Sequence, residues 1–144
     1  MSTVNVLVIV NVQQALGSIG AGNQNIGQWV YMVDSTGYFR NGQGGNELVT
    51  TVISGDELIW QVTPIDPSET VVINNFSGQA IGTNPANGQI VNPAQYQQYN
   101  PTGSVWGGYV TSTSNGQVQY TLQLQFANGD TGWFDPYLVS NAPQ

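Results

Sequence analysis

The sequence contains no histidine, no cysteine and only one basic side chain, Arg40. Without imidazole and thiol groups, the chain can form no Ser-His-Asp triad, no Cys-His dyad, no zinc site with nitrogen or sulfur ligands and no disulfide. Nucleic acids and anionic membranes are bound through clustered lysine and arginine. We therefore expect no nucleic-acid partner and no membrane partner.

Charged residues are also scarce, at 6% of the 144 residues, against roughly 25% in an average soluble domain. The polarity comes instead from 15 Asn and 16 Gln residues. Amide side chains form hydrogen bonds but are poor at transferring protons, so we predict that the protein is not an enzyme.

The formal charge of −7 is screened beyond roughly 8 Å at physiological salt. An amide-rich surface with flat edge strands then favours a homo-oligomer.

The chain shows no sequence sign of export or membrane insertion. The apolar segment at residues 4–12 lacks a preceding basic region and a small-residue cleavage site, so it does not have the pattern of a signal peptide. No apolar run approaches the ~18 residues of a membrane helix. We expect the protein in the cytoplasm.

Hydrophobic and polar residues alternate along many segments, which is the period of a β-strand. In residues 118–126, Val, Tyr, Leu, Leu and Phe share one face and Gln and Thr occupy the other. Asn115-Gly116 and Asn128-Gly129 are hairpin-turn signals, so residues 106–138 are predicted to form a three-stranded meander. Further strands are expected at residues 4–12, 28–34, 47–53, 57–63, 70–76, 104–111 and 131–139.

These strands predict a single all-β domain over residues 1–144. The favoured architecture is an antiparallel two-sheet β-sandwich, jelly-roll or Ig-like, with roughly seven to nine strands. A closed β-barrel is the alternative, because side-chain alternation is the same in both. Two segments rich in Gly, Asn and Ser or Pro, residues 16–27 and 77–103, are predicted to be loops. The best helical segment, residues 94–99, is very short.

Eight carboxylates are the only candidates for acid–base or metal chemistry, and most lie in turn sequences, where Asp commonly caps the turn itself. A carboxylate pair of the glycosidase kind is the enzymatic rival. We predict no cofactor and no metal site. Calcium, held by loop carbonyls and acidic side chains, is the alternative, although no EF-hand pattern is present. The candidate calcium ligands are Asp66, Glu69, Asp130 and Asp135.

Aromatic and amide residues gather in the second half of the chain. An aromatic ring flanked by amides and carboxylates suits a neutral, hydroxyl-rich ligand such as a sugar, whereas a cation-poor surface repels anions. The long loop and the last hairpin supply the candidate ligand-binding residues: Tyr96, Tyr99, Asn100, Trp106, Asp130, Trp133 and Asp135. The competing interpretation is that Trp106 and the tyrosines only fasten the loop to the sandwich.

Two functions follow from these features. The first is a non-catalytic binding module with lectin-like recognition of a neutral carbohydrate or other small polar ligand. The alternative is a self-assembling structural protein that has no ligand site.

Several segments, in their order along the chain, resemble the AidA/PixA inclusion body protein family of bacteria. They are distributed over nearly the whole chain, at residues 2–12, 33–39, 45–48, 55–67, 76–80 and 134–138. The resemblance implies a small cytoplasmic protein, regulated by quorum sensing in some members and deposited as intracellular inclusions. It implies for the alternative function a self-assembling structural or storage protein of cytoplasmic inclusion bodies, which condenses at high expression. It carries over no catalytic residues. The family includes proteins named for methionine-rich inclusions, and this chain departs from them because Met1 and Met32 are its only methionines.

Overall fold

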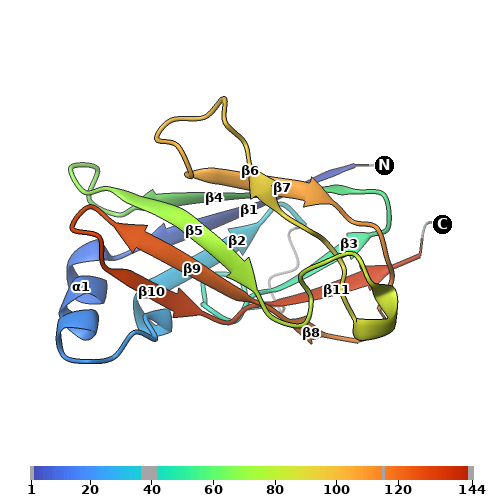
Figure 1. The fold of residues 1–144 in the computed structure, drawn as a ribbon, viewed down its shortest axis with the longest axis horizontal. Helices are drawn as coiled ribbons and strands as arrows, with labels where there is room; N and C mark the ends of the chain where they lie inside the picture. Colours follow the sequence, from blue (N-terminus) through green and yellow to red (C-terminus); the bar gives the residue numbers. More distant parts are fainter. Residues whose placement is uncertain (1, 37–41, 115, 143–144) are drawn as a thin grey trace.

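A computed structural model describes residues 2–36, 42–114 and 116–142, in which eleven β-strands form the two layers of a sandwich (Figure 1). One layer is a five-stranded sheet of order β2-β1-β4-β7-β6. Its strands are β2 (Val30–Asp34), β1 (Thr3–Val10), β4 (Glu57–Pro64), β7 (Val105–Tyr109) and β6 (Ala94–Gln95).

The opposite layer consists of two three-stranded sheets, of orders β10-β9-β5 and β3-β11-β8. Their strands are β10 (Thr131–Phe134), β9 (Thr121–Phe126), β5 (Val71–Ser77), β3 (Val49–Ile53), β11 (Tyr137–Asn141) and β8 (Val118–Gln119). None of the three sheets closes into a barrel within the described residues. The predicted all-β sandwich is therefore confirmed.

The predicted antiparallel pairing is wrong for two strand pairs. Strand β1 runs parallel to β4, with Val6 opposite Trp60, and β3 runs parallel to β11, with Val49 opposite Tyr137. Side chains alternate with a period of two in either direction, so the sequence pattern does not reveal which way a strand runs. The direction of each strand is determined instead by the long connections between the paired strands.

The predicted meander over residues 106–138 is correct only in its second half. Strands β9 and β10 form the hairpin at Asn128-Gly129, where Gly129 adopts the positive φ of 89° that the turn requires. Strand β7, however, pairs with β4 and β6 in the other layer. Asn115, half of the other turn signal, and Arg40, the single basic residue, lie outside the described residues.

The strand predicted at residues 118–126 keeps its alternation but changes sheet midway. Between β8 and β9, Tyr120 donates its backbone N–H to Pro136 O at 3.0 Å. The chain thereby crosses from the β3-β11-β8 sheet to the β10-β9-β5 sheet. Five alternate side chains still point inward, namely Val118, Tyr120, Leu122, Leu124 and Phe126.

The prediction of a surface loop over residues 16–27 is wrong in its first part, which continues the helix α1 (Val12–Gly20). The side chain of Asn11 caps this helix by accepting a hydrogen bond from Gln14 N at 3.3 Å. Four residues at helical spacing pack on the core, namely Val12, Ala15, Leu16 and Ile19. Two glycines weaken the intrinsic helix propensity by about 1 kcal/mol each, so tertiary packing decides this element.

The segment predicted as the long loop, residues 77–103, contains little regular structure. It holds a single 3-10 turn at Pro85–Asn87 and the two-residue strand β6. The helix considered for residues 94–99 does not form, because Ala94 and Gln95 pair instead with β7. This pairing fastens the loop to the five-stranded sheet.

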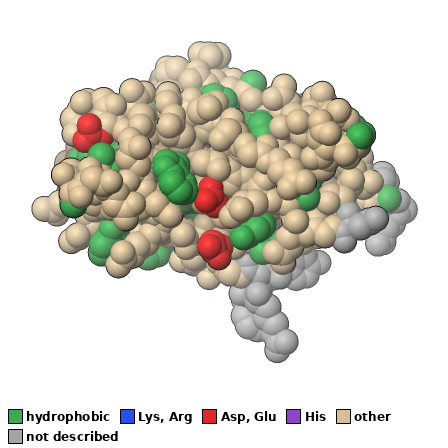
Figure 2. All heavy atoms as spheres, turned by 60° about the horizontal axis from the view of Figure 1, so that its bottom comes forward, with side chains coloured by type: hydrophobic (Ala, Val, Ile, Leu, Met, Phe, Trp, Pro, Cys, Tyr) green, Lys and Arg blue, Asp and Glu red, His purple; other side chains and the backbone are tan. Residues whose placement is uncertain are grey.

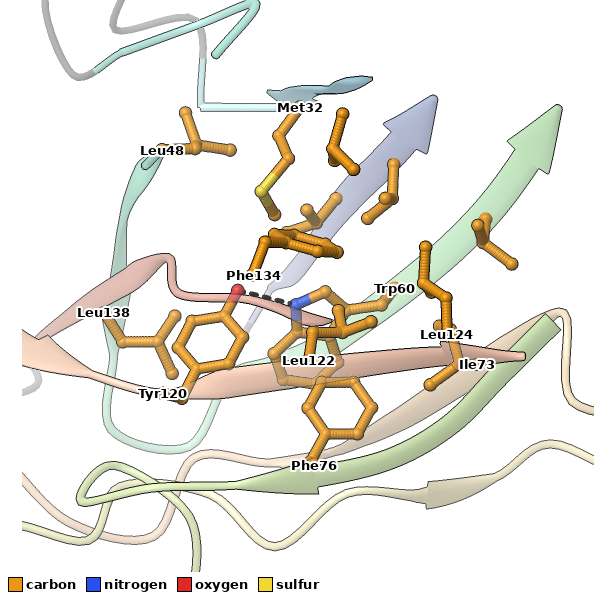
Figure 3. Packing of buried hydrophobic residues seen from close by; sticks show 14 of the residues in the cluster. Met32, Leu48, Trp60, Ile73, Phe76, Tyr120, Leu122, Leu124, Phe134 and Leu138 are labelled. Carbon is orange, nitrogen blue, oxygen red and sulfur yellow. Dashed lines mark hydrogen bonds between the residues drawn. The ribbon is translucent and has the colours of Figure 1, made fainter. Parts of the chain in front are cut away.

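One continuous hydrophobic core lies between the layers, with aromatic side chains at its centre (Figure 3). Trp60 of β4 packs 4.6 Å from Phe76 and 5.9 Å from Tyr120, measured between ring centroids. Its indole Nε1 donates a buried hydrogen bond to the Tyr120 hydroxyl at 3.0 Å. Burial raises the pKa of that hydroxyl above its ordinary value, so the group stays neutral.

The turn before β4 is stabilised by Asp56, whose side chain is 4% exposed. Burial alone would raise the pKa of Asp56, but hydrogen bonds from Ile53 N, Ser2 N and the Ser2 hydroxyl outweigh it and hold the pKa below 3.8. Because the pKa is lower in the folded state than in the unfolded state, the ionised carboxylate stabilises the fold at pH values above the pKa of the unfolded state. That stabilisation is lost as the pH falls through the lower, folded value.

Asp56→Asn is therefore expected to lower the free energy of unfolding by about 1–3 kcal/mol at neutral pH, because one amide oxygen replaces two carboxylate acceptors. The deficit should shrink in acid below 3.8, the ordinary pKa of the group. Urea unfolding at neutral and acidic pH measures both. Glu69→Gln, at an exposed carboxylate in the β4–β5 turn, is the control and should change little. A loss of stability that is the same at both pH values would contradict the lowered pKa of Asp56 in the folded state.

Candidate functional site

The structure distributes the predicted ligand-binding residues over several regions instead of gathering them into one site. Trp106 points into the sandwich, where its ring lies 5.5 Å from Phe76 and its Nε1 donates to Ile73 O at 3.1 Å. This tryptophan packs against the core cluster. In this structure Trp106 fastens β7 to β5 and presents no free indole N–H.

Tyr96 and Tyr99 lie on the outer face of the five-stranded sheet, with ring centroids 6.5 Å apart. The Tyr96 hydroxyl donates to Glu57 Oε2 at 2.7 Å, and burial together with this bond raises the pKa of Tyr96. A Cβ at Gly107 would lie 2.6 Å from Tyr96 Cζ, so the glycine makes room for this ring. The ring of Tyr96 therefore occupies the space above Gly107.

Asn100 and the acidic turn residues occupy further separate positions. Asn100 and Glu69 line a surface cavity of about 460 Å³ beside the end of β4. Asp66 accepts hydrogen bonds from the backbone and hydroxyl of Ser68, and these bonds lower its pKa. Asp130 caps the β9–β10 turn by accepting a hydrogen bond from Asn128 Nδ2 at 3.0 Å.

The described residues contain no group of three or more acidic side chains placed to hold one metal ion. The four proposed calcium ligands thus do not converge on a single point. Calcium binding stays a prediction that rests on the residue types alone.

Trp133 and Asp135 are the two predicted residues that the structure brings together in one cavity. They lie on the outer face of the β10-β9-β5 sheet, which we call the Trp133 face. The cavity is open and has a volume of about 380 Å³. Its remaining lining residues are polar, namely Asn75, Ser77, Thr121 and Gln123.

Strand register explains why these side chains are neighbours. Gln123 lies opposite Trp133 on one side and opposite Asn75 on the other, which makes one row across the sheet. Thr121 lies opposite Ser77 and donates to Asp135 Oδ1 at 2.7 Å, which makes the adjoining row. Alternation therefore places an aromatic ring, amides, hydroxyls and one carboxylate on a single flat surface.

The sequence carried a signal for two of the four lining residues that the predicted site omitted. Thr121 and Gln123 occupy the polar half of the same alternating segment whose apolar half marks the core. Asn75 and Ser77 lie on β5, a strand distant in sequence, and a bulge between Ile73 and Asn75 shifts its register. Pairing between distant strands is not encoded by alternation, so these two could not be assigned to the site.

A second cavity, of about 300 Å³, lies on the outer face of the five-stranded sheet. Its floor is formed by Leu7, Ile59 and Val105, and Tyr99 forms part of its wall. Asp34 also lines the cavity, but its carboxylate lies on the inner side of the sheet, where it accepts hydrogen bonds from Gln43 Nε2 and Thr50 Oγ1, at 2.9 and 2.8 Å. This face offers an apolar surface and few free polar groups.

Charge is sparse on the molecular surface. Figure 2 shows a face on which uncharged polar side chains and backbone predominate, with only a few hydrophobic and acidic side chains among them. Asp135 is the one carboxylate among the residues lining the Trp133 cavity. A pair of carboxylates of the glycosidase type is therefore absent from the lining of that cavity. Among the described residues, every helix is too short or too polar to cross a membrane.

Comparison with known proteins places the chain in a family. Residues 2–132 match the family model described as a domain of unknown function, DUF8788. A crystal structure of an inclusion body protein, PixA, from Burkholderia cenocepacia J2315 is similar, with a TM-score of 0.63 and 11% sequence identity. The match covers 99% of this chain and 95% of that one. The search for curated relatives finds no match.

The identity to PixA is low, so this likeness concerns the fold. At that level, the resemblance to the AidA/PixA family that the sequence indicates is confirmed. The family model spans most of the chain, from β1 through the start of β10. The chain therefore belongs to the DUF8788 family, and its β-sandwich is that of a PixA-type inclusion body protein.

Proposed function

We propose that this chain is a non-catalytic structural protein that assembles with copies of itself into cytoplasmic inclusion bodies. Two facts support the proposal: the full-length likeness to the fold of an inclusion body protein, and the character of one molecular surface. That surface is the outer face of the five-stranded sheet, which we call the tyrosine face, and it is the observation that carries the proposal.

The tyrosine face combines exposed aromatic rings with an apolar sheet surface. Tyr31, Tyr99 and Tyr109 are 36%, 44% and 56% exposed. Between them lie half-buried aliphatic side chains on the outer side of β1, β2 and β4, including Leu7, Val33 and Ile59. Tyrosine is enriched at protein interfaces because its ring buries a large apolar area while its hydroxyl still forms hydrogen bonds.

Charge favours a second copy of this chain as the occupant of the face. Glu57 lies there, and its carboxylate already accepts a hydrogen bond from the Tyr96 hydroxyl. Asp34 shares the inner face with Val6, where Gln43 and Thr50 donate hydrogen bonds to it. Two identical faces can therefore meet with little unpaired charge between them, as a two-fold contact requires. The other acidic residues lie in turns or on the opposite layer, where like-charge repulsion between copies is screened by salt.

Two sheet edges are closed to strand addition, which favours packing through a face. The β2 edge is covered where Met32 exchanges backbone hydrogen bonds with Gly44 and Gly45. The β10 edge is covered where Trp133 N–H donates to Gln24 O and Trp133 O accepts from Ile26 N. Covered edges of this kind prevent uncontrolled strand pairing.

The test is a concentration series in sedimentation or light scattering, in which the native protein is expected to grow beyond the monomer mass. Replacing Tyr31 and Tyr109 together by serine should weaken association by about tenfold or more, because aromatic residues dominate interface energies. Ile65→Ser is the matched control, since Ile65 is as exposed as Tyr109, at 56%, but lies beyond β4. A monomer at all concentrations, or equal effects of both variants, would refute the proposal.

A further inference from the structure

Trp133 differs from the other three tryptophans of this protein. Trp60 is fully buried in the core cluster, and Trp29 and Trp106 pack against that cluster. Trp133 belongs to neither set, although its strand neighbour Phe134 is 0% exposed. A large aromatic ring held partly exposed on a sheet surface contributes little to the core, so its presence calls for another explanation.

The indole of Trp133 is also left free to bind. The indole N–H groups of Trp60 and Trp106 are taken by Tyr120 and by Ile73 O. The indole N–H of Trp133 donates to no atom of the described residues. Its backbone, by contrast, is fixed on both sides, by β9 and by the Gln24–Ile26 segment. The ring is therefore held on a rigid base and keeps an unused donor.

The polar side chains around the ring have both hydrogen-bond donors and hydrogen-bond acceptors that no described residue uses. Asp135 Oδ1 accepts from Thr121, whereas Oδ2 accepts nothing from the described residues. Gln123 Oε1 accepts from Asn74 at 2.6 Å, which orients the amide and leaves Nε2 as a donor. The side chains of Asn75 and Ser77 are exposed and form no hydrogen bond with the described residues. Acceptors and donors thus stand in the two rows beside the indole.

We propose that the Trp133 face binds a neutral saccharide, with the apolar C–H face of a pyranose ring on the indole. Sugar hydroxyls would donate to Asp135 Oδ2 and accept from Gln123 Nε2, Asn75 and the Trp133 N–H. The cavity of about 380 Å³ falls within the ~300–1,000 Å³ of small-ligand sites. The net charge of −7 and the nearby Asp135 disfavour anionic ligands.

This site differs from the one that the sequence suggested. It retains Trp133 and Asp135, adds residues of β5 and β9, and leaves out Trp106, Tyr96, Tyr99, Asn100 and Asp130. It lies on the opposite outer surface from the tyrosine face. Saccharide binding does not depend on assembly, so either proposal can fail without the other.

The experiment is isothermal titration calorimetry of the whole protein with maltohexaose, cellohexaose and chitohexaose, each up to millimolar concentration. At least one is expected to bind, and Trp133→Ala should weaken that binding by about tenfold or more. Asp135→Asn, which keeps the size of the side chain but removes the charged acceptor, should weaken it as well. Circular dichroism and thermal melting establish that each variant is folded.

Tyr109→Ala is the matched control, because it removes an exposed aromatic ring from the other outer surface. It should leave saccharide binding unchanged. The proposal is overturned if none of the three oligosaccharides binds the native protein. It is also overturned if Trp133→Ala binds as tightly as the native protein, or if Tyr109→Ala is impaired to the same degree.

Discussion

Phe134→Ala is expected to lower the free energy of unfolding by about 3–5 kcal/mol, the largest single effect that we predict. Phe134 is 0% exposed and lies in the middle of the core, between Met32 and Trp60 (Figure 3). Removing its ring eliminates apolar burial and leaves a cavity that rigid strands on both layers cannot close. Chemical denaturation monitored by far-ultraviolet circular dichroism measures the loss.

Trp133→Ala is the control for this prediction, because it removes a still larger ring from the adjacent residue of the same strand. Trp133 faces outward and lies outside the core cluster. We expect it to cost no more than about 1 kcal/mol, as for a surface substitution with some loss of packing. If both variants lost equal stability, the assignment of the inner and outer faces of β10 would be wrong.

Tyr120→Phe is expected to lower the free energy of unfolding by about 1–3 kcal/mol, although it removes one oxygen atom and creates almost no cavity. Tyr120 accepts the hydrogen bond from Trp60 Nε1 at 3.0 Å in a fully buried position. The substitution leaves the indole N–H buried without a partner. An unsatisfied buried donor costs its full desolvation, since no water replaces the lost acceptor.

Tyr137→Phe supplies the comparison, because it makes the same chemical change at a partly exposed site. The Tyr137 hydroxyl accepts from Gln119 Nε2 at 3.3 Å, where water can take its place. We expect a change within about 0.5 kcal/mol. Equal costs for the two tyrosines, measured in the same denaturant series, would show that the Trp60–Tyr120 bond contributes nothing specific.

The outer surfaces of the two layers differ in their chemistry and suit the two proposed functions separately. The tyrosine face is apolar, and the carboxylate of Glu57 on it is hydrogen-bonded to Tyr96, which favours contact between copies. The Trp133 face is polar, with acceptors and donors around a single ring that no described residue occupies. An assembly built through the first surface would leave the second one accessible to a ligand.

Much of the fold followed from local patterns in the sequence. Alternation over residues 118–126 identified the inward side chains correctly, and Asn128-Gly129 located the β9–β10 hairpin, because both depend only on neighbouring residues. The helix α1 was missed since its nine residues are too few, and too rich in glycine, for propensity to reveal it. Packing of Val12 and Ala15 on the core stabilises it instead.

By itself, the sequence determined the all-β class, the scarcity of charge, the lack of imidazole and thiol chemistry, and the inward residues of most strands. Only the tertiary structure decided which strands are neighbours and which run parallel. It therefore also decided that Trp106 faces the core, that Tyr96 fills the space above Gly107, and that Trp133 shares a surface with Asn75. The reason is physical: alternation records the face on which a side chain lies, whereas pairing between distant strands depends on packing across the whole chain.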